Sequence, residues 1–264
     1  MRGDGRILRT TKEREMASEA LVMLRRVAPG ECSRRAAWDT GREAVQRKTS
    51  GQLAMHENDL CRTSTGKPFV KTSLQDTQLD LRFSLAHADR MAAFALCLQG
   101  FELGVDVEPV ERTPRSASTS NFCRRWLAPA EASALERGCV AFSALWVAKE
   151  AVAKASALGL SGLPPRSFSV WNTHRDCFLP EVLARSGPAA GEPLALDVLL
   201  DPLHTHVVAV SWSGYRRDVL LYCSCLESNE QNASDGLSYV RHPLAGNSVN
   251  GVATNVRRMK SMHG

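Results

Sequence analysis

The sequence predicts an α+β fold in which a helix precedes strands in each half of the chain. Apolar residues recur at helical spacing over residues 17–27 and again over 142–158. Between them, apolar and polar residues alternate over 83–87 and 101–107, which is typical of β-strands. With 264 residues, 44% of them apolar and 23% charged, the chain can bury the core of one large domain or two smaller ones.

The first helix is expected over residues 17–27, where Pro29-Gly30 stops it. Residues 31–60 are polar and show no clear periodicity. Gly66-Lys67-Pro68 predicts a turn, and residues 71–80 are expected to form a loop.

A β-hairpin is expected next. Phe83-Ser84-Leu85-Ala86-His87 alternates, and residues 91–98 form a continuous apolar run. Gln99-Gly100 is typical of a tight turn, after which alternation resumes over 101–107. The strand before this turn is therefore expected to pair with the strand after it.

The second half begins with a polar connection over residues 111–121, followed by a helix that starts at Pro129. The most strongly patterned helix spans 142–158, and Gly159 is expected to cap it. Strands are expected over residues 168–171, 194–200 and 206–212. Beyond Cys225 the pattern is lost, so residues 227–264 are expected to be largely disordered.

Charge and cysteine usage exclude several classes of protein. The net charge is only +5, and although 26 of the 33 basic residues are Arg, no dense basic run occurs, so nucleic-acid binding is not expected. The eight Cys include no CxxC pair and no His/Cys spacing typical of zinc. No apolar run approaches the roughly 18 residues of a membrane span, and the N-terminus does not resemble a signal peptide. A cytoplasmic protein with reduced thiols and no membrane partner is expected.

Gly104-Val105-Asp106-Val107-Glu108 places two carboxylates on one face of a strand. Residues two apart face the same side, so Asp106 and Glu108 lie about 6 to 7 Å apart, opposite the apolar face, with open space expected beside Gly104. Such a pair can share one cation, because without it the two charges repel. A solvated polar face on an edge strand is the alternative.

On the helix over 142–158, Trp146, Glu150 and Lys154 recur every four residues and form one stripe, with Lys149 at its border. The alternative for Glu150 and Lys154 is an ordinary surface pair. Three carboxylates beside two lysines would suit a divalent cation and a substrate that carries phosphate.

The order G-V-D-V-E, then W-x-x-K-E-A-x-x-K, resembles the 4′-phosphopantetheinyl transferases, and more closely their surfactin-synthetase-activating type. Arg62-Thr63-Ser64-Thr65-Gly66-Lys67-Pro68 looks like the R-T-x-x-G-K-P element of that family, and Phe83 to His87 looks like its F-N-x-S-H element. Residues 125–131 look like its variable segment before the catalytic helix. The resemblance covers about residues 17–212.

The resemblance implies transfer of phosphopantetheine from coenzyme A to a serine of an apo acyl or peptidyl carrier protein domain. By the family motif, Asp106, Glu108 and Glu150 would hold magnesium, and Glu150 is also the candidate base for the carrier serine. Lys154 would pair with the pyrophosphate. Lys149 would either contact phosphate or extend its ammonium to solvent.

At the nucleotide end, the resemblance assigns Arg62, Lys67 and His87 to coenzyme A, with His87 and an arginine at the 3′-phosphate. Two positions depart from the family pattern, since Ser84 and Ala86 stand where Asn and Ser are usual. Losing the serine hydroxyl at Ala86 would remove one phosphate contact, worth about 1 to 2 kcal/mol.

The family also implies two similar α/β subdomains related by a pseudo-twofold axis, with the active site in the cleft between them. The expected division is residues 1–108 on the nucleotide side, 109–226 with the metal and the catalytic helix, and the tail 227–264. An internal pseudo-dimer would act as a monomer. The alternatives are a holo-acyl-carrier-protein synthase restricted to fatty-acid synthesis and a non-catalytic relic that binds coenzyme A or a carrier.

Overall fold

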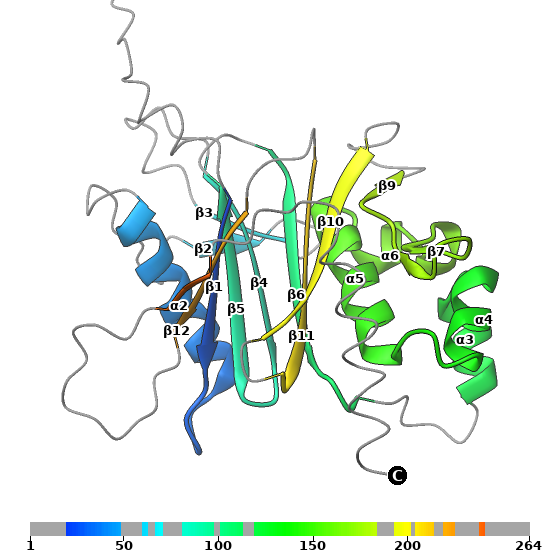
Figure 1. Ribbon diagram of the computed structural model, residues 1–264. Coiled ribbons are helices and arrows are strands. Elements are labelled where there is room, and N and C mark those ends of the chain that lie inside the picture. Colours follow the sequence, from blue (N-terminus) through cyan, green and yellow to red (C-terminus); the bar gives the residue numbers. More distant parts are fainter. Residues whose placement is uncertain are drawn as a thin grey trace, which may run out of the picture.

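Two β-sheets lie face to face between two helices, so the molecule has four layers (Figure 1). The computed structural model describes residues 20–48, 60–62, 67–70, 81–97, 101–112, 119–183, 193–201, 204–213, 219–224 and 238–240. The first sheet has the strand order β13-β12-β1-β5-β4, and the second has the order β6-β11-β10-β9. The α+β class predicted from the sequence is confirmed.

The first sheet contains β1 (Ala20–Arg26), β4 (Arg82–Ala88), β5 (Met91–Cys97), β12 (Val219–Ser224) and β13 (Ser238–Val240). The expected helix over 17–27 is wrong, because most of this segment is β1. Leu21 and Met23 pack in the cluster under helix α2, whereas Val22 and Leu24 pack in the cluster between the sheets. A strand buried on both faces gives a continuous apolar run, which periodicity alone does not distinguish from a buried helix.

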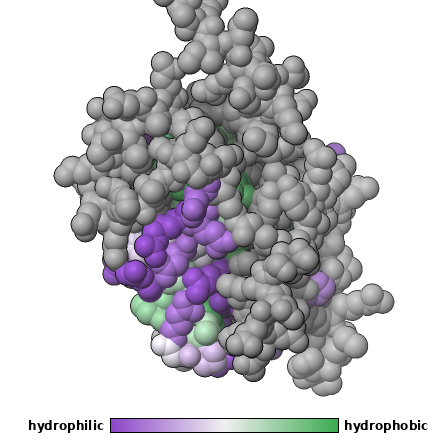
Figure 2. Space-filling view, turned by 90° about the vertical axis from the view of Figure 1, so that its left-hand side faces the viewer, coloured by the Kyte–Doolittle hydropathy of each residue, from purple (hydrophilic) through white to green (hydrophobic). Residues whose placement is uncertain are grey.

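Helix α2 (Ser33–Lys48) covers the outer face of this sheet, in a segment for which the sequence predicted no regular structure. Its buried side is built from small residues, Ala36, Ala37, Thr40 and Ala44 among them. Because these residues carry little apolar surface, the helical stripe is faint in the sequence. The opposite side of α2 is polar, with Arg34, Arg35 and Arg42 exposed. Figure 2, seen from the side on which α2 lies in Figure 1, shows hydrophilic residues gathered on this face of the molecule.

The expected hairpin across Gln99-Gly100 is also wrong. β5 pairs with β4, and the chain turns at Asp89-Arg90, where Asp89 has a φ of +46°. β6 (Leu103–Pro109) instead joins the second sheet, where it pairs with β11 in the register Asp106↔Ala209. Its inner residues Leu103, Val105 and Val107 pack against the first sheet, so β5 and β6 meet face to face and not edge to edge.

The second sheet confirms two further predicted strands, β10 (Pro193–Leu200) and β11 (His206–Ser213), and adds β9 (Glu181–Leu183). Only the end of the strand expected over 168–171 forms, as β7 (Trp171–Asn172), which pairs with β8 (Cys177–Phe178). The residues before it turn as a short 3₁₀ helix, η3 (Pro165–Ser167). A separate hairpin joins β2 (Leu60–Arg62) to β3 (Pro68–Val70), which begins within the predicted turn at residues 66–68.

Helix α5 (Phe142–Ala155) packs on the outer face of the second sheet, as its strong periodicity predicts. Its C-cap is Ser156, and Ala157 takes the left-handed conformation at φ +60°, so the helix ends before the expected cap at Gly159. Gly159 opens the short helix α6 (Gly159–Gly162). Two more helices precede α5, namely α3 (Thr119–Trp126) and α4 (Pro129–Glu136), and α4 starts at Pro129 as predicted.

The loop expected over 71–80 lies outside the described residues. So does most of the tail 227–264, of which Ser238–Val240 forms β13 beside β12. The division at residue 108 and the pseudo-twofold axis stay predictions. No helix in the described part of the chain has both the length and the apolar character of a membrane span.

Candidate active site

Strand β6 and helix α5 approach each other closely at Gly104. A Cβ atom added there would lie 2.1 Å from the carbonyl oxygen of Ala151 and 2.6 Å from the amide nitrogen of Ala155. The open space expected beside Gly104 is therefore filled by the helix backbone. This contact brings the polar face of β6 directly against the last two turns of α5.

Asp106 meets Lys154 at this contact. Oδ1 of Asp106 accepts a hydrogen bond from Nζ of Lys154 at 2.7 Å, and the same ammonium donates to the carbonyl of Val105 at 3.0 Å. Oε2 of Glu150 lies 3.9 Å from Nζ of Lys154. Asp106 is only 5% exposed, and its Oδ2 has no hydrogen-bond partner among the described residues.

The two carboxylates affect each other's ionisation. Burial raises the pKa of Asp106, and the charge of Lys154 opposes this rise. Burial, followed by the charge of Asp106, raises the pKa of Glu150 to about 7, with Lys154 again acting in the opposite direction. The positive charge of Lys154 therefore does not fully compensate the burial of the two carboxylates, and the pKa of each stays raised.

Glu108 lies on the same face of β6 but forms an ion pair with Arg112, four residues further along the chain. Asp106 and Glu108 thus contact different cations instead of sharing one. Within the described ranges, no group of three or more His, Cys, Asp or Glu side chains is placed to hold a metal ion.

A cavity of about 230 Å³ opens where the edge of the first sheet meets the end of α5. It brings together three cationic side chains predicted for the site, Arg62, Lys67 and Lys154. Its remaining lining residues come from both halves of the chain: Pro68, Ser84, Leu85, Ala157 and Gly159. Such a cavity has the charge and size to bind a phosphate-bearing group.

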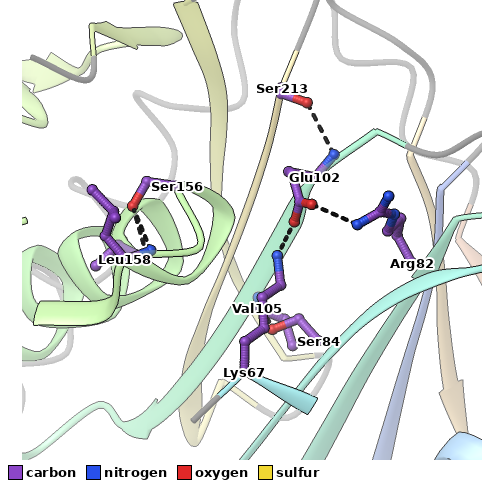
Figure 3. A network of polar contacts seen from close by, with 9 residues as sticks. Lys67, Arg82, Ser84, Glu102, Val105, Ser156, Leu158 and Ser213 are labelled. Atoms are coloured by element: carbon purple, nitrogen blue, oxygen red, sulfur yellow. Dashed lines mark hydrogen bonds and ion pairs between the residues drawn. The ribbon is translucent and has the colours of Figure 1, made fainter. Parts of the chain in front are cut away.

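Lys67 does not act alone at this cavity. Figure 3 shows Lys67 and Arg82 directed at the carboxylate of Glu102, to which both are ion-paired. Neither Glu102 nor Arg82 was predicted as a site residue. Their contacts join segments distant in the sequence, so no local motif could have indicated them.

His87 is exposed and is not among the residues that line the cavity. Its Nδ1 lies 3.1 Å from Oγ of Ser33, at the start of α2. Burial, followed by the charges of Lys154 and Arg34, lowers the pKa of His87. Ser33 and Arg34 thus belong near the predicted nucleotide end, and sequence reasoning missed them because it missed α2.

The two departures from the family pattern have different surroundings. Oγ of Ser84 accepts a hydrogen bond from the amide of Val105 at 3.0 Å and also lines the cavity. Ala86 is 5% exposed and packs in the apolar cluster between the sheets.

The sequence analysis expected Lys149 either to contact phosphate or to extend to solvent. In the structure, Lys149 neither lines the cavity nor extends to solvent. Its side chain is fully buried and ion-paired with Glu131 at 2.8 Å. Its ammonium also donates to the carbonyls of Pro165 at 2.6 Å and Phe168 at 2.9 Å. Lys149 is therefore part of the core that supports α5.

Comparison with known proteins gives one family. Residues 102–207 match the family model of the 4′-phosphopantetheinyl transferase superfamily. A search of curated proteins gives no match to the chain. The matched stretch, which is less than half of the chain, contains Asp106, Glu108, Glu150 and Lys154.

Proposed function

We propose that the protein transfers the 4′-phosphopantetheine group of coenzyme A to a serine of an apo carrier protein domain, as the surfactin-synthetase-activating type does. The proposal depends mainly on one observation, namely that the family match and the contact between β6 and α5 involve the same side chains. The family match at residues 102–207 contains Asp106, Glu150 and Lys154, the side chains that β6 and α5 bring together.

The cationic cavity supports coenzyme A as the donor. Arg62, Lys67 and Lys154 line it, so a pyrophosphate bound there would meet positive charge on several sides. His87 and an arginine near the start of α2 would bind the 3′-phosphate. Ser84 would take part through its position in the lining, while Ala86 contributes only packing.

The carboxylates fit a magnesium ion. Among the described residues, Oδ2 of Asp106 is buried without a hydrogen-bond partner, and burial, followed by the charge of Asp106, raises the pKa of Glu150. Carboxylate oxygens are the ligands that magnesium prefers. Asp106 and Glu150 would hold it, and Glu108 would join them on exchanging its ion pair with Arg112. When bound, magnesium supplies positive charge to the pyrophosphate and the leaving phosphate.

Glu150 would accept the proton of the carrier serine, since its carboxylate lies beside Lys154 at the end of α5, where the phosphates would bind. The serine oxygen then bonds to the phosphorus next to pantetheine. The bond from that phosphorus to the bridging oxygen breaks, and adenosine 3′,5′-bisphosphate leaves with the electron pair. Lys154, fixed by Asp106 and the carbonyl of Val105, would stabilise the charge that develops on the phosphates.

The proposal includes a monomeric, cytoplasmic enzyme. Arg62, Lys67 and His87 lie outside the matched domain, in the first half of the chain. Because the cavity needs that half, a fatty-acid-specific synthase built from the second half alone is the less favoured alternative.

The test is to incubate the protein with coenzyme A, magnesium and several apo carrier domains, and to measure the carriers by mass spectrometry. Addition of phosphopantetheine to a carrier serine is expected, and Glu150→Gln should abolish it in a protein that remains folded. A folded wild-type protein that binds coenzyme A but modifies no carrier would favour the non-catalytic relic.

A further inference from the structure

Glu102 forms ion pairs with two cationic side chains at the edge of the cavity, although Glu102 itself does not line the cavity. One carboxylate oxygen is ion-paired with Nζ of Lys67, and the other accepts a hydrogen bond from Nη1 of Arg82 at 2.9 Å (Figure 3). Lys67 lines the cavity, whereas Glu102 and Arg82 do not. Glu102 therefore contacts Lys67 from outside the binding space.

The backbone of Glu102 is fixed to the second sheet. Its amide donates to Oγ of Ser213 at 3.0 Å, and the amide of Ser213 donates to the carbonyl of Glu102 at 2.8 Å. The second of these bonds continues the backbone pairing of β6 with β11 beyond Leu103↔Trp212. The carboxylate of Glu102 is thus attached to a backbone position that the second sheet holds in place.

Lys67, in contrast, belongs to a peripheral element. It directly precedes β3, and β3 pairs only with β2 among the described strands. A two-stranded hairpin is marginally stable by itself, so contacts with the rest of the molecule must hold it in place. The Lys67–Glu102 pair is such a contact, and both side chains are largely shielded, with 16% and 23% exposed.

Among the described residues, other cationic side chains also lie near Lys67. Arg82 approaches the same carboxylate from β4, and Arg62 and Lys154 line the same cavity from β2 and α5. Burial lowers the pKa of Lys67 and the charge of Arg82 lowers it further, while Glu102 raises it through its hydrogen bond and charge. Glu102 thus offsets part of the lowering that burial and the charge of Arg82 cause.

We propose that Glu102 is a positioning residue, which holds the ammonium of Lys67 in place at the cavity wall so that anionic ligands bind there. This inference rests on the proposed function for its ligand, coenzyme A. It opposes the simplest electrostatic expectation, in which removal of a negative charge near an anion site strengthens binding.

The experiment measures binding of adenosine 3′,5′-bisphosphate by calorimetry to the wild-type protein and to Glu102→Gln. The substitution preserves the size of the side chain and removes its charge. Affinity should fall about three- to tenfold, because a charge-assisted hydrogen bond no longer holds Lys67. The loss of affinity should grow as pH rises, because Lys67 in the Glu102→Gln variant releases its proton at a lower pH than in the wild type. Equal or tighter binding overturns the inference.

Three further variants separate positioning from general effects. Glu102→Asp, which retains the charge, should recover most of the affinity. Glu181→Gln, at an exposed site on β9, should leave it unchanged. In a Lys67→Met background, Glu102→Gln should have no further effect, and an undiminished loss there would show that Glu102 does not act through Lys67.

A second measurement does not depend on the ligand. The chain has seven Lys, so NMR of protein labelled at the lysine ε-carbons can follow the Lys67 signal, identified by its loss in Lys67→Met. Lys67 should titrate at lower pH in Glu102→Gln than in the wild type. If the wild type binds neither adenosine 3′,5′-bisphosphate nor coenzyme A, the proposed function fails while this titration still decides the role of Glu102. An unchanged titration refutes that role and leaves the proposed function standing.

Discussion

Lys149 and Glu131 form an ion pair in which neither side chain is exposed to solvent. The network around the pair is complete, because the oxygens of Glu131 also accept hydrogen bonds from the amides of Ala128 at 2.7 Å and Val170 at 2.8 Å. Burying a charge is costly unless it is paired and hydrogen-bonded. The pair therefore fixes α5 to the segments around it, one residue before Glu150.

Replacing Lys149 by Met should lower the free energy of unfolding by about 3 to 5 kcal/mol, because Glu131 would remain buried without its counter-charge. Urea denaturation measures this loss. Arg137→Met is the control, since the Arg137–Asp176 pair is exposed on both sides and should contribute little. Similar unfolding midpoints for Lys149→Met and the wild type would mean that the buried pair is not stabilising.

Glu150 gives the metal-free protein a distinctive dependence on pH. Its pKa is about 7 in the folded protein against 4.5 for the ordinary side chain, so the folded state retains a proton that the unfolded state has lost. Stability should therefore fall as pH rises from about 4.5 to about 7. At pH 8, Glu150→Gln should be about 1 to 3 kcal/mol more stable than the wild type without metal.

Thermal unfolding across this pH range checks the prediction. Adding magnesium at pH 8 should raise the melting temperature of the wild type and leave that of Glu150→Gln nearly unchanged, because a ligand stabilises only the state that binds it. Parallel pH profiles for the two proteins would contradict the raised pKa.

At the level of elements, the contact between β6 and α5 determines the geometry of the site. Gly104→Ala would place a methyl group 2.1 Å from the carbonyl oxygen of Ala151, so the helix must move away from the strand. Stability should fall by about 1 to 3 kcal/mol, and coenzyme A binding should weaken, because Lys154 moves with the helix. Urea denaturation and calorimetry measure the two effects.

Gly138→Ala provides the comparison for this substitution. Gly138 has a φ of +68° and no heavy atom within 4 Å of an added Cβ, so only the backbone conformation is penalised. The variant should lose about 1 kcal/mol of stability and bind coenzyme A normally. If Gly104→Ala also bound normally, the close approach would not be needed for the site.

The same elements explain which parts of the structure could be predicted. β4, β10 and β11 and helices α4 and α5 carry periodic patterns or start signals in their own sequences, and all were predicted. β1 and α2 were not, because β1 is apolar on both faces and α2 buries mainly small residues. The hairpin failed because Gln99-Gly100 is a good turn signal, whereas the pairing of β6 depends on β11, a strand much later in the chain.

For the site, the sequence could bring Asp106, Glu150 and Lys154 together because two family motifs contain them. Asp106 lies in the motif G-V-D-V-E, and Glu150 and Lys154 lie in the motif W-x-x-K-E-A-x-x-K. The environment of those residues depends on packing. The ion pair of Glu108 with Arg112, the burial of Lys149 and the contact of Glu102 with Lys67 all arise from tertiary structure. The assignment of magnesium ligands and coenzyme A contacts stays a prediction.

At the level of the whole molecule, strand β12 follows the second sheet in the sequence but belongs to the first sheet. β12 pairs in parallel with β1, in the register Ala20↔Val219, and covers an edge of that strand. Truncation after Ser213 would remove β12 and leave β1 with unpaired backbone groups beside apolar side chains. Such edges promote aggregation.

The truncated protein should therefore unfold at lower temperature and aggregate on concentration, as light scattering and thermal unfolding would measure. Truncation after Val240, which retains β12 and β13, is the control and should behave as the full chain does. A stable, monodisperse protein ending at Ser213 would mean that β12 is dispensable.

The pairing of β1 with β12 also affects the order of events during synthesis. β1 is made before the other described elements, yet β12, one of its two partner strands, becomes available only after nearly all of them have been made. Contacts between such distant segments are slow to form, because a long loop must close first. The first sheet supplies β4 to the wall of the cavity, so the nascent chain should acquire its full ligand affinity only after β12 has been made.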